Sequence, residues 1–234
     1  MTLIVATVGL HGSASTWAFN VARELALAAG PPEDALSFYA DRVEDIPPKA
    51  ATHSRIVIKS HHGSPELDAW LSERAAHLVL SLRDPRDAAI SMAQRFKAPL
   101  RDAVTWLRRD CERLDRLRAR PHLMLRYETR FFDRPETVTA IAAHLSIAVT
   151  ADAAEAIFET YRTEAVRAFA QTLGVLPAQR RQPFGDAFMD RVTHIHSPHI
   201  GDGRSGKWKQ LPAEIRQAAT ATFRPFLAAF DYEE

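Results

Sequence analysis

Near its start the chain carries a segment of small and hydroxylated residues that could bind an anion. The segment, residues 9–17, reads Gly-Leu-His-Gly-Ser-Ala-Ser-Thr-Trp and follows an apolar run rich in Val and Ile. Small side chains allow several backbone N–H groups to approach one oxyanion, and a helix that begins here adds the positive end of its dipole. The residues that would bind the anion in this way are Gly12, Ser13, Ala14, Ser15 and Thr16.

The segment differs from the phosphate-binding loop of ordinary nucleoside triphosphatases, which reads G-x-x-x-x-G-K-[ST]. Counted from Gly9, positions 14 and 15 hold Ala and Ser instead of Gly and Lys, and only Thr16 matches the hydroxyl position of the motif. Residues 201–207 do match G-x-x-x-x-G-K, but Trp208 follows in place of a metal-binding hydroxyl and no strand precedes them. Neither segment therefore predicts an ordinary nucleoside triphosphatase.

Four further groups of polar residues lie where predicted strands end or in a late irregular stretch. They are residues 59–62 (Lys-Ser-His-His), residues 83–87 (Arg-Asp-Pro-Arg-Asp) with Ser91 after them, residues 125–128 (Leu-Arg-Tyr-Glu) and residues 201–209. Open α/β sheets bind ligands at the carboxyl ends of their strands. We therefore expect these groups to meet at one site.

The elements that would position these groups alternate along the first half of the chain. Runs of aliphatic and β-branched residues predict strands at residues 1–8, 55–59, 77–82 and 122–126. Apolar spacing and composition predict helices at residues 16–29, 65–74, 85–96, 100–118, 135–145, 153–173 and 212–230. This pattern predicts an α/β fold with a P-loop-type central parallel sheet flanked by helices, followed by a mostly helical C-terminal half.

Residues 174–209 are rich in Pro, Gly, His and Arg and show no steady periodicity. A segment of this length without regular structure is usually functional, so we expect an irregular lid that binds a cofactor. It lies within a single predicted domain, residues 1–234. Phe184, Phe188 and Met189 of this segment would either line a binding pocket or anchor the loop.

The composition is that of an ordinary globular domain. Of the 234 residues, 46% are hydrophobic and 25% are charged, and 30 basic against 29 acidic residues give a net charge of +1. No overall field therefore favours nucleic acid as a partner. The single Cys111 excludes an intrachain disulfide, and no signal peptide or membrane span is visible, so we expect a cytoplasmic protein. The sequence leaves the oligomeric state open.

Taken together and in this order, the motifs resemble those of the PAPS-dependent sulfotransferases, over about residues 4–230. PAPS is 3′-phosphoadenosine 5′-phosphosulfate. In that family the loop reads roughly P-K-S-G-T-T-W, and the later motifs read K-T-H, R-N-P-x-D followed by Ser, R-Y-E-D, and R-K-G-x-x-G-x-W-K. The short chain resembles a compact bacterial type.

The resemblance implies transfer of the sulfuryl group from PAPS to a hydroxyl or amine of a small-molecule acceptor, with PAP as product and no metal. In-line transfer depends mainly on positioning and on stabilisation of charge. His61 would be the general base, since imidazole accepts a proton near neutral pH, and Lys59 would place a cation near the sulfonate. His62, as its neighbour, should face the other way. Which of the two is the base stays open.

The resemblance also assigns residues to the nucleotide. Arg83 and Ser91 would hold the 3′-phosphate, the group that distinguishes PAPS from ATP. Trp17 and Tyr127 would contact the adenine, although core packing also explains both. The late segment would fold over the 3′-phosphate through Arg204, Ser205 and Gly206.

The sequence departs from the family in its first loop. Gly12 stands where the family has a Lys, and His11 stands where it has a Pro. Loss of one cation at the leaving phosphate would cost about 3 kcal/mol of transition-state stabilisation. Lys59, His11 or Arg204 are the residues that could replace it.

Two other functions are compatible with these residues. The Gly12 substitution is also expected in a protein that binds PAP or PAPS but turns over poorly. A P-loop small-molecule kinase would share the architecture and would bind ATP with magnesium. A sulfotransferase must release PAP, which separates it from both.

Overall fold

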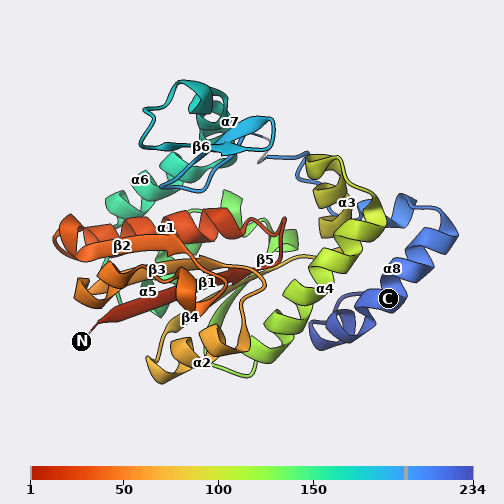
Figure 1. Ribbon diagram of the computed structural model, residues 1–234, viewed down its shortest axis with the longest axis horizontal. Helices are drawn as coiled ribbons and strands as arrows, with labels where there is room; N and C mark the ends of the chain where they lie inside the picture. The colour runs from red at the N-terminus through yellow and green to blue at the C-terminus, as the bar shows by residue number, and fades with distance from the viewer. Residues whose placement is uncertain (1, 198–199, 234) are drawn as a thin grey trace.

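The computed structural model describes residues 2–197 and 200–233. At its centre lies a five-stranded sheet with the strand order β2-β3-β1-β4-β5, in which all neighbours are parallel (Figure 1). Crossover connections join successive strands, as parallel pairing requires. The strands are β1 (Leu3–Gly9), β2 (Ala35–Tyr39), β3 (Arg55–Ser60), β4 (His77–Leu82) and β5 (His122–Arg126).

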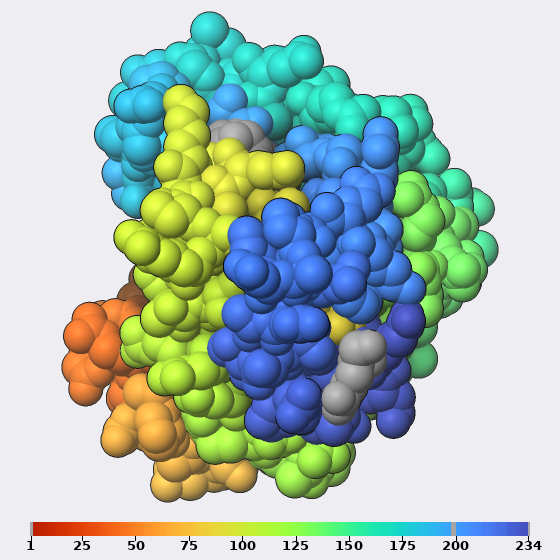
Figure 2. Space-filling view, turned by 90° about the vertical axis from the view of Figure 1, so that its right-hand side faces the viewer, coloured from red at the N-terminus to blue at the C-terminus, as the bar shows by residue number. Residues whose placement is uncertain are grey.

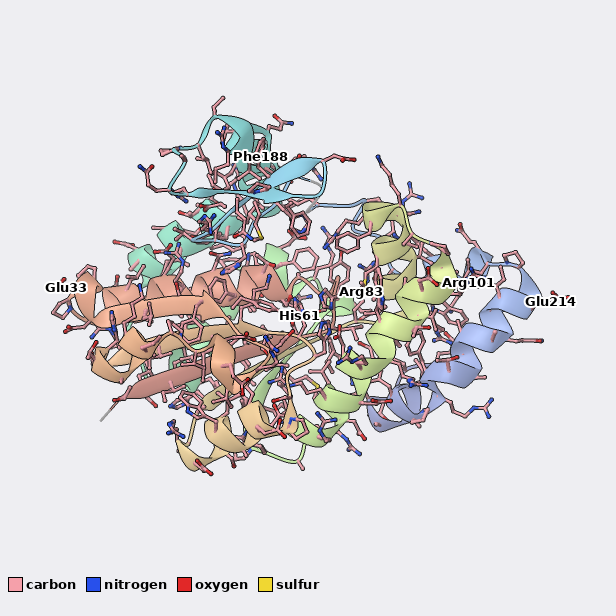
Figure 3. All side chains as sticks on the ribbon, in the orientation of Figure 1. Glu33, His61, Arg83, Arg101, Phe188 and Glu214 are labelled. Carbon is pink, nitrogen blue, oxygen red and sulfur yellow. The ribbon has the colours of Figure 1, made fainter. Side chains whose placement is uncertain are left out.

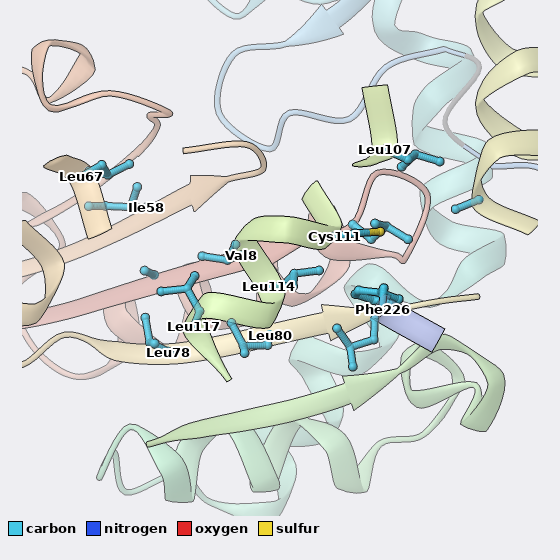
Figure 4. Close-up of a cluster of buried hydrophobic side chains, with 14 of the residues drawn as sticks. Val8, Ile58, Leu67, Leu78, Leu80, Leu107, Cys111, Leu114, Leu117 and Phe226 are labelled. Carbon is cyan, nitrogen blue, oxygen red and sulfur yellow. The ribbon is translucent and has the colours of Figure 1, made fainter. Parts of the chain in front are cut away.

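Helices cover both faces of the sheet. On one face, Leu107, Cys111 and Leu114 of α4 pack in one apolar cluster with Val8 of β1 and Leu80 of β4 (Figure 4). The other face is covered by α1 and the helices α5 to α7, in a second buried cluster. The helices are α1 (Ser15–Ala28), α2 (Pro65–Glu73), α3 (Pro85–Phe96), α4 (Leu100–Leu117), α5 (Glu136–His144), α6 (Ala151–Tyr161), α7 (Thr163–Thr172) and α8 (Ala213–Ala229).

The structure confirms the predicted fold class. Two of the four predicted strands have the predicted bounds, β3 extends one residue further, and β1 begins at Leu3, after Thr2, and ends one residue later than predicted, at Gly9. Met1, which the prediction placed in the first strand, lies outside the described residues. In the space-filling view, α8 lies against the surface formed by α3 and α4 (Figure 2). The buried Phe223 and Phe226 of α8 belong to the cluster on that face.

The structure differs from the prediction at three elements. The edge strand β2 was not predicted. The single helix predicted over residues 153–173 is wrong, because extended backbone at Arg162 (φ −59°, ψ 154°) separates α6 from α7. The stretch predicted as irregular contains an antiparallel hairpin, β6 (Arg181–Phe184) with β7 (Ala187–Asp190). Within the described part of the chain, no helix has the length and apolar character to cross a membrane.

Candidate active site

A cavity of about 930 Å³ lies at the carboxyl ends of the parallel strands. Residues from β3, the loop after β1, and the segments after β4 and β5 line it, together with residues from the hairpin region. Figure 3 shows His61 and Arg83 at this end of the sheet. The sequence motifs therefore meet at one place, as the predicted topology required.

In the loop between β1 and α1, the Ser13 N–H donates to the Leu10 carbonyl, but the backbone N–H groups of Gly12, Ala14, Ser15 and Thr16 have no partner among the described residues. Gly12 (φ +82°) and Ala14 (φ +60°) have left-handed backbone, and no side chain caps the start of α1. The first N–H groups of a helix have no partner within the helix, so they can bind an anion. Ser13 has a different role: its buried hydroxyl donates to the Leu10 carbonyl at 2.6 Å and stabilises the turn. The loop residues that line the cavity are His11, Gly12, Ala14, Ser15, Thr16 and Trp17.

Lys59 brings a cation to this loop. Its Nζ donates a hydrogen bond to Thr16 Oγ1 at 2.7 Å, and the side chain is buried. Burial, with a contribution from the nearby positive charge of Arg95, lowers the pKa of Lys59 from 10.5 to about 7. Although Gly12 carries no charge, the loop thus has an ammonium group that an anion would hold in its charged form.

His61 lines the cavity in one defined tautomer. Its Nδ1 lies 2.6 Å from the Gly9 carbonyl oxygen, which can only accept, so Nδ1 carries the hydrogen and Nε2 is the basic atom. Burial, together with the nearby His11 and Lys59, lowers its pKa well below 6.5. The ring is therefore neutral at pH 7.

His62 faces away from the cavity, as the alternation of neighbouring residues predicted. It lines a second hollow of about 480 Å³, beside Asp41 and Arg109. Its Nδ1 lies 2.8 Å from Asp110 Oδ1, and the hydrogen bond to this carboxylate raises the pKa of His62. Of the two adjacent histidines, only His61 can reach a ligand in the main cavity.

Arg83 and Ser91 converge, as the eight-residue spacing predicted. Arg83 Nη1 donates to Ser91 Oγ at 3.2 Å and to the Gly12 carbonyl at 2.9 Å, and Nη2 donates to the Arg204 carbonyl at 2.8 Å. Three of its five N–H groups are thereby used. The Nε hydrogen and the second Nη2 hydrogen have no partner among the described residues. Lys207, to which the sequence reasoning gave no role, adds an Nζ at 3.3 Å from Ser91 Oγ.

Trp17 and Tyr127 both line the cavity. The guanidinium of Arg83 lies over the Tyr127 ring, 4.0 Å from its centre. Trp17 makes an edge contact with Phe131, and its buried Nε1 has no hydrogen-bond partner among the described residues. Buried donors without partners are unusual in folded proteins. The unused N–H groups of Trp17 and Arg83 therefore fit a ligand that brings acceptor atoms into this cavity.

In the glycine-rich segment, residues 201–209, the predicted binding residues do not line the cavity. Arg204 and Ser205 are exposed, and with Gly206 they fall outside the cavity lining. Arg204 contributes its backbone carbonyl to Arg83, while the Gly206 N–H donates to the Asp87 carboxylate. The residues of this segment that line the cavity are Gly201, Asp202, Gly203 and Lys207.

The remaining wall of the cavity combines aromatic, aliphatic, polar and charged side chains. Phe184 and Met189 line it, as the sequence allowed, but Phe188 packs against a buried apolar cluster instead. His194 and His196 lie in the same wall, and burial lowers the pKa of each to about 3. Because Arg95, Glu164 and Arg167 also line the cavity, a second ligand would meet both aromatic and charged groups.

A buried carboxylate that sequence reasoning did not single out adjoins the site. Asp110 of α4 lies 2.7 Å from His11 Nδ1 through Oδ2, and it also bonds His62. Ligand atoms of these three residues lie within 4.8 Å of one another, so they are also a group that could hold a metal ion.

No protein-family profile and no curated protein sequence matches the chain. Among solved structures, the mouse sulfotransferase SULT7A1 complexed with PAP is similar to it with a TM-score of 0.66 and 13% identity, over 97% of this chain and 85% of that one. The chain has a sulfotransferase fold. Retinol dehydratase is also similar, in complex with retinol and PAP (TM-score 0.61, 15% identity) and with androsterone and PAP (0.62, 14%). Each match covers 98% of this chain and 82% of the other.

Proposed function

We propose that this protein is a sulfotransferase that moves the sulfuryl group of PAPS to a hydroxyl or amine of a small-molecule acceptor. The observation that carries the proposal is that one cavity brings together two groups of donors that could bind anions: the loop with Lys59, and Arg83 with Ser91 and Lys207. A nucleotide with phosphates at both its 5′ and 3′ positions matches this pair. The PAP complexes of proteins with this fold support the assignment.

The residues present fit the nucleotide. Gly12, Ala14, Ser15 and Thr16 would hold the 5′ end through backbone N–H groups, and Arg83 would hold the 3′-phosphate through its unused N–H groups. Trp17 and Tyr127 would contact the adenine. When bound, PAPS supplies a sulfuryl group already activated by its bond to phosphate.

The side chains around the loop would then position the reacting groups and stabilise the charge that develops during the transfer. Lys59 would place positive charge where negative charge develops on the transferred group and on the leaving oxygen. A cavity histidine would take the proton of the acceptor, and the sequence resemblance assigns this role to His61. We also propose, on the sequence resemblance, a cytoplasmic enzyme of a compact bacterial type. The buried Cys111, whose pKa burial raises, is in keeping with a reducing compartment.

The test is turnover. Purified protein is mixed with PAPS and a panel of phenols, alcohols and amines, and both PAP and sulfated product are measured, with ATP and magnesium as a separate arm. We expect one PAP per sulfated product. Tight binding of PAPS without product would favour a binding protein, and phosphorylated product from ATP would favour a kinase.

Gly12 provides a test between an enzyme and a binding protein. If the missing loop lysine had abolished turnover, Gly12→Lys would restore it. We expect no gain in kcat, because Lys59 already reaches the loop, and a loss of about 1 kcal/mol in the free energy of unfolding, because φ at this position is +82°. Product formation and thermal unfolding are measured together. A rise in kcat of tenfold or more would contradict the role given to Lys59.

Binding of PAP should draw a proton from solution at alkaline pH. With a pKa of about 7, Lys59 is mostly neutral at pH 8.5, and the bound phosphate favours its charged form. We expect uptake of about one proton per PAP at pH 8.5 and clearly less at pH 6, where Lys59 is already charged. Calorimetry in buffers of different ionisation enthalpy measures the number of protons taken up per PAP, and Lys59→Met is the control. Equal uptake in the variant would assign the proton to another group.

A further inference from the structure

His11 occupies the position just before Gly12 and lines the cavity. Its ring stacks on His61, with the ring centres 3.7 Å apart and an angle of 21° between the planes. Asp110 holds His11 twice: Oδ2 accepts the backbone N–H at 2.9 Å and lies 2.7 Å from ring Nδ1. Because Asp110 is completely buried, this pair fixes the ring at the edge of the loop.

The partner atoms define the tautomer of His11. Hydrogen bonds from His11 and His62 hold the pKa of Asp110 well below its usual range in spite of burial, so the carboxylate is ionised and can only accept. His11 Nδ1 must then carry the hydrogen. Nε2 is left as the basic atom of a ring whose opposite nitrogen is bonded to a carboxylate, the arrangement found in His–Asp catalytic pairs.

The two cavity histidines differ in what would stabilise them after taking a proton. His61 bonds to the neutral carbonyl of Gly9 and lies near Lys59, so an added positive charge there is buried and repelled. His11 bonds directly to Asp110, which would neutralise the same charge. A general base is most effective where its protonated form is stabilised as the proton arrives.

We propose, on the basis of the proposed function, that His11 is the general base and that Asp110 is its positioning residue. The acceptor O–H or N–H bond breaks as a bond forms between that hydrogen and His11 Nε2. A lone pair of the acceptor oxygen or nitrogen forms the new bond to sulfur, the pair of the broken O–H or N–H bond stays on that atom, and the pair of the breaking S–O bond stays on the phosphate of the departing PAP. His11 returns its proton to water after the product leaves.

The distances favour hydrogen bonds over a metal within this group. A tetrahedral zinc ion with ligands at about 2.0 Å would keep the ligand atoms about 3.3 Å apart. The His11–Asp110 and His62–Asp110 distances are 2.7 and 2.8 Å, which are ordinary hydrogen-bond lengths. His62 thus hydrogen-bonds Oδ1 of Asp110, so both oxygens of this buried carboxylate have a partner.

The kinetic test compares single variants with the best acceptor from the panel. We expect His11→Gln to lower kcat about 100-fold, and Asp110→Asn about 30-fold, with KM for PAPS within threefold of the wild type. His61→Asn should lower kcat less than tenfold, and His53→Gln, far from the cavity, should change nothing. PAP affinity and thermal unfolding report whether each variant folds. A 100-fold loss in His61→Asn together with a small loss in His11→Gln would overturn the proposal.

A second measurement does not depend on turnover. In protein labelled with ¹⁵N-histidine, the ring resonances absent from His11→Gln belong to His11, and we expect them to show hydrogen on Nδ1 and none on Nε2. The opposite tautomer would overturn the proposal, as would stoichiometric Zn²⁺ binding that removes the Nδ1 hydrogen. If the wild type makes no product with any acceptor, the proposed function itself fails. If it does and His11→Gln is equally active, only the base assignment fails.

Discussion

Replacing Arg83 with alanine is expected to lower the preference of the protein for PAP over AMP about 1,000-fold. The two nucleotides differ only in the 3′-phosphate, which Arg83 would bind with its two unused N–H groups. Two charge-assisted hydrogen bonds at about 2 kcal/mol each correspond to about 1,000-fold in affinity. Isothermal titration of each nucleotide into wild type and variant measures the two ratios.

The ratio of affinities separates the 3′-phosphate from a general effect on the loop. Arg83 also bonds the Gly12 carbonyl, so its loss could weaken both nucleotides equally, but only a lost 3′-phosphate contact changes their ratio. Arg83→Lys keeps the positive charge but lacks the planar guanidinium with its paired N–H donors, so it should recover part of the preference for PAP over AMP. Arg101→Ala is the matched control, because that side chain is 88% exposed on α4. An unchanged ratio in Arg83→Ala would place the 3′-phosphate elsewhere.

The sequence predicted those elements of the fold whose own residues show a clear pattern. Continuous aliphatic runs identified four of the five strands, because strands buried on both faces have few polar residues. The edge strand β2 reads Ala-Leu-Ser-Phe-Tyr and is only partly buried, so its pattern resembles a loop. The hairpin β6–β7 was missed for a related reason: β6 contains Pro183, and its residues pair only with one neighbouring strand.

The site was predictable to the extent that its residues follow strands. Lys59, His61 and Arg83 follow from the rule that parallel strands present their carboxyl ends at one edge. Asp110 could not be found in this way, because it lies within an amphipathic helix whose sequence around it, Arg-Arg-Asp-Cys-Glu, is typical of a solvated face. Only the packing of α4 beside the first loop buries that carboxylate against His11. Tertiary contacts of this kind have no local sequence signal.

Lys59→Met is expected to lower kcat about 1,000-fold while KM for PAPS changes less than tenfold. The ammonium group is buried at the hydroxyl of Thr16, and a preorganised donor in such a site contributes about 3–4 kcal/mol to the transition state. Methionine preserves the length of the aliphatic chain but removes the charge. Initial rates at varied PAPS concentration separate the two constants, and Lys49→Met, an exposed lysine, is the control.

The pH dependence of stability shows whether the variant acts through this charge. Lys59 has a folded pKa of about 7 and an unfolded value near 10.5, so between these values the unfolded chain binds the extra proton. The free energy of unfolding of the wild type should therefore gain from this group as pH rises from 7 towards 10.5, and Lys59→Met should lack that gain. Urea unfolding at pH 7.5 and 9.5 measures the slopes. At pH 7 the variant should be no less stable than the wild type, since burying an ammonium group is unfavourable. If kcat and the free energy of unfolding at pH 7 both fall in Lys59→Met, the role of Lys59 is to stabilise the loop. The proposed chemistry would then lack the cation that it needs beside the transferred group.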